Sequence, residues 1–88
     1  MPEAIHGLVH DQHGRPIEQA RVCFVSGPVP LPDVAALTDP NGTFLLTAPV
    51  PGTYSILCAL DDGRTETRSV DVTSHSKATV IFEMAVDR

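Results

Sequence analysis

Residues 38–47 read Thr-Asp-Pro-Asn-Gly-Thr-Phe-Leu-Leu-Thr, and this short stretch decides the fold. Its first half is a turn, because Pro40 fixes φ at the second position of a β-turn and Gly42 accepts positive φ. In the second half, Phe44 and Leu46 alternate with residues that face the other way, which is the period-two pattern of a half-buried strand. The stretch therefore predicts a tight turn that leads directly into a β-strand.

The same pattern repeats along the chain on both sides of this stretch. Short apolar runs alternate with turn residues at spacings of about 8–14 residues, which is typical of a β-sandwich or barrel. Eight prolines and six glycines leave no convincing helical window. Strands are expected at Ala4–His10, Ala20–Val25, Ala35–Thr38, Thr43–Thr47, Thr53–Leu60, Arg64–Val72 and Ala78–Val86. We therefore predict an all-β fold, a seven-stranded, two-sheet sandwich of Greek-key type with antiparallel or mixed sheets, formed by residues 1–88 as one domain.

The alternation within these strands predicts which side chains fill the core. The chain has no Trp and only four aromatic residues, so the core is expected to be mainly aliphatic. Parity turns Cys58 inward and Cys23 outward, and we expect two free thiols. The inward positions are Ala20, Val22, Phe24, Phe44, Leu46, Tyr54, Ile56, Cys58, Val70, Val72, Val80, Phe82 and Met84.

The charge balance of the chain restricts the classes of partner that it is expected to bind. The net charge is −5, and the six basic residues are scattered, so there is no basic stripe for nucleic acid. No run approaches the roughly 20 apolar residues that span a bilayer, and no signal peptide precedes the first strand. We expect a cytoplasmic protein for the chain as written, or an extracytoplasmic one if it was excised from an exported protein.

Several residues are expected to act only through backbone geometry. Gly14 and Gly42 close turns that need positive φ. Gly7 lies inside a strand, which predicts either the close approach of another backbone or a β-bulge. The hydroxyl of Tyr54 is expected to bind nearby backbone. The full set of structural turn residues is Gly14, Pro16, Asp39, Gly42, Pro51, Gly52 and Tyr54.

The order of these motifs resembles a known family. The run Ile5-x-Gly7-x-Val9-x-Asp11-x-x-Gly14-x-Pro16-Ile17-x-x-Ala20-x-Val22 is similar to the opening of the carboxypeptidase regulatory-like domain. The family's middle motifs resemble Thr38-Asp39-x-x-Gly42-x-Phe44-x-Leu46 and Pro51-Gly52-Thr53-Tyr54-x-Ile56. The resemblance implies a transthyretin-like, or prealbumin-like, β-sandwich. It also implies a non-catalytic module, usually appended to peptidases, surface proteins, transporters or secretion-system components.

No group of residues forms a recognisable catalytic or metal-binding motif. His6 and His10 share a strand face about 13 Å apart, too far to chelate one metal. The run from Asp39 to Gly42 looks like part of a calcium loop but lacks the further acidic ligands. No Ser lies in a Gly-x-Ser-x-Gly context. We therefore expect no catalytic, cofactor-binding or metal residues and no cofactor, and a hydrolase-like or metal-dependent protein is the less favoured alternative.

The outward-facing apolar residues are the remaining candidates for function. Parity turns five large aliphatic side chains away from the core: Leu8, Val25, Leu45, Leu57 and Ile81. They are either ordinary exposed residues or one patch that docks against a protein partner or a fused neighbouring domain. The proline-rich segment 28–32 is a second candidate contact loop. A sandwich that binds carbohydrate or another small ligand is the main alternative, but it would need exposed aromatic residues.

Overall fold

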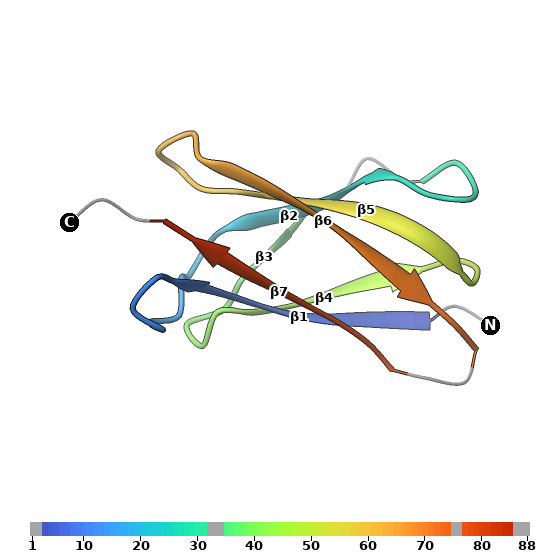
Figure 1. Cartoon of the computed structure of the whole chain (residues 1–88), viewed down its shortest axis with the longest axis horizontal. Coiled ribbons are helices and arrows are strands. Elements are labelled where there is room, and N and C mark those ends of the chain that lie inside the picture. The colour runs from blue at the N-terminus through green and yellow to red at the C-terminus, as the bar shows by residue number, and fades with distance from the viewer. Residues whose placement is uncertain (1–2, 32–34, 75–76, 86–88) are drawn as a thin grey trace.

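The computed structural model describes residues 3–31, 35–74 and 77–85, and within these ranges every regular element is a β-strand. The strands are β1 (Glu3–Asp11), β2 (Arg21–Ser26), β3 (Ala35–Leu37), β4 (Thr43–Ala48), β5 (Gly52–Ala59), β6 (Thr65–Val72) and β7 (Ala78–Met84). They form two layers, a three-stranded sheet in the order β4-β1-β7 and a four-stranded sheet in the order β3-β2-β5-β6 (Figure 1). The predicted all-β, seven-stranded, two-sheet sandwich is confirmed.

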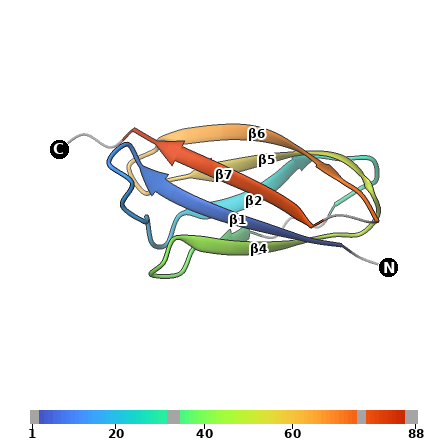
Figure 2. The ribbon, with the colours of Figure 1, turned by 60° about the horizontal axis from the view of Figure 1, so that its bottom comes forward.

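The two sheets differ in the direction of their strands. In the three-stranded sheet, β1 pairs antiparallel with β4 and parallel with β7, so the first and last strands of the sandwich are neighbours. In the four-stranded sheet all pairings are antiparallel. The layers approach each other at both sides: β6 lies against β7 (Figure 2), and β3 lies near β4. The sheets are therefore mixed and antiparallel respectively, as expected.

The core lies between the sheets and follows the predicted parity. Tyr54, Ile56, Cys58 and Phe82 are fully buried. Phe24 is only half-buried, and its ring packs against Tyr54 with the ring centroids 5.2 Å apart. The β2–β5 register shifts between Phe24 and Ser26, at the end of this pairing. In the longer strands, alternation was thus sufficient to separate the inner faces from the outer ones.

The strand boundaries differ from the prediction by one or two residues. Thr38 is buried but lies after the end of β3, and Ala20 is buried just before β2. The last strand ends at Met84, whereas we expected Val86, which lies outside the described residues. Of the proline-rich segment, residues 27–31 form a loop as expected, and residues 32–34 lie outside the described part.

Gly7 has a different structural role from either predicted one. Its strand pairs with β4 in unbroken register, so there is no bulge at this position. The space beside its Cα is filled by the ring of Phe44, its cross-strand partner, and a Cβ there would lie 1.9 Å from the ring's Cζ. Both expectations, a close backbone and a bulge, were therefore wrong, because Gly7 makes room for an aromatic side chain.

The two cysteines lie on adjacent strands but on opposite faces of one sheet. Cys58 is buried in the core and pairs with Val22, whereas Cys23 pairs with Leu57 and is half-buried. Burial raises the pKa of the Cys58 thiol to about 11, and the negative charges of Cys23 and Glu66 add to this effect. Because the thiolate is the nucleophile, Cys58 is held in its unreactive form at neutral pH.

Candidate functional site

Three turns with the same backbone hydrogen bonds close one end of the sandwich. In each, the N–H of the first residue donates to the carbonyl of the fifth, and the N–H of the fourth residue, a glycine, donates to the carbonyl of the first. The turns are residues 11–15, 39–43 and 60–64, and their glycines have φ of 81°, 77° and 92°. This is a three-residue loop with a left-handed residue at its end. The positive φ predicted for Gly14 and Gly42 is confirmed.

Two of these turns begin with an aspartate that binds its own loop. Asp11 Oδ1 accepts hydrogen bonds from the backbone N–H groups of Arg15 and His13, at 2.9 Å and 2.8 Å. These bonds, first that from Arg15, hold the pKa of the Asp11 carboxyl below its usual value although burial opposes them. The Thr43 hydroxyl and backbone N–H act on Asp39 in the same way and lower its pKa.

The carboxylates of these two aspartates accept hydrogen bonds from the backbone of their own turns rather than pointing toward a shared site. In the described residues, no three His, Cys, Asp or Glu side chains lie close enough together to hold a metal ion. His10 Nδ1 donates to the Asp11 carbonyl at 2.8 Å. Nor, within the same ranges, does a Ser or Cys side chain donate a hydrogen bond to a His or a carboxylate, as a nucleophile activated by a base would require. The observed role of Asp11 and Asp39 is thus to bind the backbone of their own turns.

We expect acid to destabilise the fold through Asp11 and Asp39. Because the folded state lowers both pKa values below the unfolded value of about 3.8, the two charged carboxylates stabilise the protein fully above that pH. This contribution is lost as the pH falls through the folded pKa values, so the free energy of unfolding should drop between about pH 5 and about pH 2. Urea unfolding measured across this range checks the expectation.

The double variant Asp11→Asn/Asp39→Asn tests the cause of the acid effect. It should be less stable than the wild type at neutral pH, and the two stability curves should converge at low pH. The matched control is Asp61→Asn in the third turn, where the carboxylate of Asp62 rather than that of Asp61 accepts the Arg64 N–H. If the double variant and the wild type lose the same stability on acidification, the two aspartates are not responsible.

A buried threonine that our sequence analysis did not single out joins two loops at this end. Thr38 Oγ1 accepts a hydrogen bond from the Ala20 N–H at 2.9 Å and donates one to the Ile17 carbonyl at 2.7 Å. Its backbone also pairs with Ala20 and Gln19. Gln19 has a φ of 64°, which is unusual for a residue with a side chain. A threonine at a strand end is common, so nothing local in the sequence distinguished this one.

At the opposite end, Tyr54 binds backbone as predicted. Its hydroxyl donates to the Val50 carbonyl at 2.5 Å and accepts from the Val50 N–H at 3.3 Å, while its ring is fully buried. Gly52, with φ of 151°, starts the strand, and a Cβ there would lie 2.7 Å from the Pro28 ring. The Pro51–Tyr54 corner thus fixes both the β4–β5 connection and the start of the proline-rich loop.

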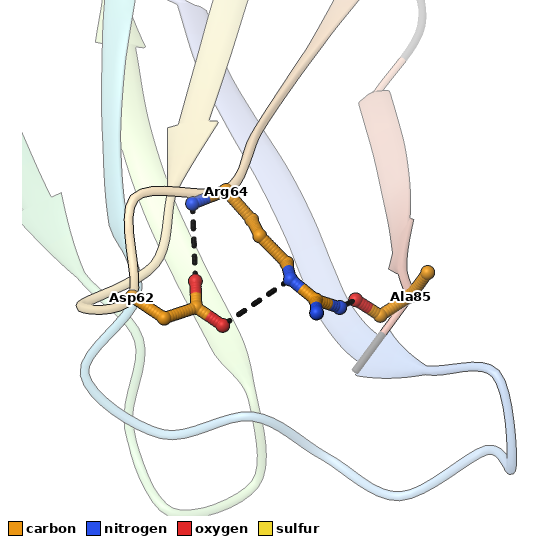
Figure 3. A network of polar contacts seen from close by, with 3 residues as sticks. All are labelled: Asp62, Arg64 and Ala85. Carbon is orange, nitrogen blue, oxygen red and sulfur yellow. Dashed lines mark hydrogen bonds and ion pairs between the residues drawn. The ribbon is translucent and has the colours of Figure 1, made fainter. Parts of the chain in front are cut away.

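An arginine connects the third turn to the last strand. The Arg64 guanidinium donates to the Ala85 carbonyl, and its Nε lies 3.3 Å from the Asp62 carboxylate (Figure 3). The ion pair is partly exposed, so its contribution to stability is less than about 1 kcal/mol. The hydrogen bond from Arg64 to Ala85 has a positional effect, since it holds the β5–β6 hairpin beside the end of β7.

The hollows formed by the described residues at the first turn and at β3 are shallow and open. One hollow of about 500 Å³ lies between the first and third turns and is lined by Ile17, Leu60 and several acidic residues. Another lies where β3 approaches β4, and Leu37 and Leu45 face it. Leu37 is 60% exposed and was not among our candidates, because a three-residue strand gives too short a pattern to assign its faces. Neither hollow encloses a ligand as a typical small-molecule site does.

The five candidate docking residues do not form one face. Leu57 of β5 pairs with Cys23 on the outside of the four-stranded sheet, and Val25 is an exposed residue of β2 within the register shift of the same sheet. The other three lie on the outside of the three-stranded sheet, and we call them the aliphatic stripe: Leu8, Leu45 and Ile81. The single patch that we considered is therefore divided between opposite sides of the sandwich.

The aliphatic stripe crosses the whole width of its sheet. Leu8 in the central strand pairs directly with Ile81. Leu45 pairs with His6, which is the neighbouring outward-facing residue of the same strand as Leu8. Leu45 and Ile81 are 55% and 51% exposed. The outward positions around them are polar or small, and they are Ala4, His6, His10, Thr43, Thr47, Thr79 and Glu83, of which Glu83 carries the single formal charge that the described residues place on this face. A partly aliphatic face with a single formal charge is suited to burial against another protein.

Comparisons with known proteins agree with this architecture. The family model of the carboxypeptidase regulatory-like domain matches residues 4–85. Among solved structures, a variant of BcpA, the major pilin subunit of Bacillus cereus, has a TM-score of 0.66 to this chain at 15% sequence identity. The match covers 98% of this chain and 30% of the pilin, so it shows a shared fold over a fraction of a longer protein. The comparison with curated protein sequences gives no significant match.

Proposed function

This chain belongs to the carboxypeptidase regulatory-like domain family, and from that premise we propose that it is a non-catalytic structural module that docks against a protein partner or a neighbouring domain. The docking surface is the outer face of the three-stranded sheet, centred on the aliphatic stripe. The observation that carries the proposal is the stripe itself, three outward aliphatic side chains on three neighbouring strands of a face with one formal charge.

The energetics of the stripe fit a docking role. Leu45 and Ile81 are each about half exposed, so burying the rest of each side chain contributes about 1 kcal/mol. Leu8 lies between them in the central strand and adds to the same contact. A carboxylate placed on this face would have to be desolvated without a partner, which costs more than the lost apolar contact.

The test compares charge placed on the two outer faces. Ile81→Glu lies in the stripe, and Val25→Glu is the matched control, because Val25 is an equally exposed aliphatic residue on the other sheet. A partner is first captured with the wild-type domain and identified, and its affinity is then measured by calorimetry with purified proteins. We expect Ile81→Glu to weaken binding at least about tenfold and Val25→Glu to leave it unchanged.

The opposite pattern would reject the proposed surface. If Val25→Glu weakens binding and Ile81→Glu does not, the partner uses the four-stranded sheet. A purified wild-type domain that hydrolyses a substrate would instead contradict the non-catalytic role. Carbohydrate binding is less well supported, because it needs exposed aromatic rings, whereas Phe44, Tyr54 and Phe82 are buried and the half-buried Phe24 packs against Tyr54.

A further inference from the structure

The first half of β6 is an exposed, unpaired sheet edge. β6 is the last strand of the four-stranded sheet and runs along the rim of the sandwich (Figure 2). Residues 65–69 are all exposed, whereas Val70 and Val72 further along are buried. The Leu60 N–H donates to the Arg64 carbonyl, so Arg64 directs its backbone carbonyl toward β5. Every second residue after Arg64 does the same, and the residues between them direct their backbone groups the other way. It follows that Thr65, Thr67 and Ser69 direct their backbone N–H and C=O groups away from β5, toward the rim.

Two opposite charges project from this edge on the core side of the sheet. Glu66 and Arg68 pair with Cys58 and Ile56, whose side chains are buried, so they point to the same side as those residues. The three-stranded sheet does not cover them, and both are exposed. The only ion pair within the described ranges is that between Arg64 and Asp62, so Glu66 and Arg68 carry charges that are not neutralised there.

We propose that this edge pairs antiparallel with the same edge of a second copy of the chain, about a two-fold axis at Thr67. Antiparallel pairing about this residue places Thr67 opposite Thr67, and Thr65 opposite Ser69 of the other copy. It also places Glu66 of each copy opposite Arg68 of the other copy, which gives two such pairs. The six backbone hydrogen bonds of this register use the rim groups of Thr65, Thr67 and Ser69 in both copies. The sequence of the edge is therefore complementary to itself in charge, in hydroxyl groups and in hydrogen bonding.

Charge complementarity is what selects a second copy as the occupant. A lone inward charge on an edge strand opposes pairing, because two copies would bring like charges together. Glu66 and Arg68 differ from this case, since each meets its opposite under the two-fold axis. Two of the other three edges fit less well: β3 has three residues, and the Thr43 backbone on the rim of β4 is already bound to Asp39.

The proposed contact is short, so the dimer should be weak. Five residues from each copy bury less than the roughly 1,600 Å² of a standard interface. We expect a dissociation constant on the order of 0.1 mM, with a single eight-stranded sheet running through both copies. The contact lies on a different strand from the aliphatic stripe, and neither surface depends on the other.

The charges are tested by reversing and then exchanging them. Sedimentation velocity over about 10 µM to 1 mM gives the dissociation constant of each protein. In Arg68→Glu, the Glu66 carboxylate of each copy faces a second carboxylate on the other copy, so two like-charged pairs form. This variant should weaken the dimer at least about tenfold. The double variant Glu66→Arg/Arg68→Glu restores both pairs and should return the constant to within about threefold of the wild type. Arg21→Glu makes the same change in net charge at an exposed site on β2, and should have no effect.

Hydrogen exchange gives a measurement that needs no variant. At high protein concentration the amides of Thr65, Thr67 and Ser69 should exchange more slowly than at low concentration, because these are the groups that pair. A wild-type protein that is monomeric at about 1 mM overturns the proposal. So does an equal effect of Arg21→Glu and Arg68→Glu, a failure of the double variant to restore the dimer, or exchange at these three amides that does not depend on concentration.

Discussion

Replacing Gly7 by alanine is expected to lower the free energy of unfolding by about 3 kcal/mol or more, a large share of the stability of a small domain. The added Cβ would lie 1.9 Å to 2.5 Å from three atoms of the Phe44 ring. That ring is only 6% exposed and packs against Phe82 with the centroids 6.2 Å apart, so moving it would disturb the packing of the core. Either β1 and β4 must separate locally or the ring must leave its rotamer.

Urea unfolding of three variants isolates this clash from the ordinary cost of losing a glycine. Gly14→Ala is the matched control, because a Cβ at Gly14 meets nothing within 4 Å and the cost there is only the positive φ, about 1–2 kcal/mol. In a Phe44→Leu background the ring is gone, and Gly7→Ala should then cost far less than in the wild type. An equal cost in both backgrounds would mean that Gly7 is required for a reason unrelated to the ring.

Local features of the sequence account for most of the fold. Alternation in runs such as Thr53–Ala59 identified the buried faces, because the side-chain period of a strand does not depend on what it pairs with. The turns that contain Gly14 and Gly42 were equally predictable, since positive φ is a local requirement. The Tyr54 hydroxyl found its partner only four residues away, at Val50.

The errors have a common origin in strand order, which is not local. Parity states that Val25 and Ile81 both point outward, but it does not say that β2 and β7 belong to different sheets. The candidate docking patch was therefore divided when the strands were assigned. Gly7 was misinterpreted for the same reason, because its neighbour Phe44 is brought beside it by the β1–β4 pairing. The charge pattern of the proposed β6 contact became visible only once β6 was known to be an edge.

Thr38 is the second position where a small change is expected to have a large effect. Its hydroxyl is the partner of two backbone groups, the Ala20 N–H and the Ile17 carbonyl, and the residue is only 3% exposed. Valine has nearly the same shape but no hydroxyl, so Thr38→Val leaves both groups without that partner in a buried place. An unsatisfied buried polar group costs about 1–3 kcal/mol. We therefore expect Thr38→Val to destabilise the protein by about 2–4 kcal/mol.

Thr38→Ser separates the hydroxyl from the shape of the side chain. Serine keeps both hydrogen bonds and loses one methyl group, so its cost should be about 1 kcal/mol, clearly less than that of valine. Urea unfolding compares the two variants, and hydrogen exchange at the Ala20 amide locates the effect, since that N–H loses its acceptor only in Thr38→Val. If serine is as destabilising as valine, packing of the methyl group, and not the hydroxyl, holds the two loops together. The strained backbone of Gln19 beside this site would then be maintained by contacts other than the Thr38 hydroxyl.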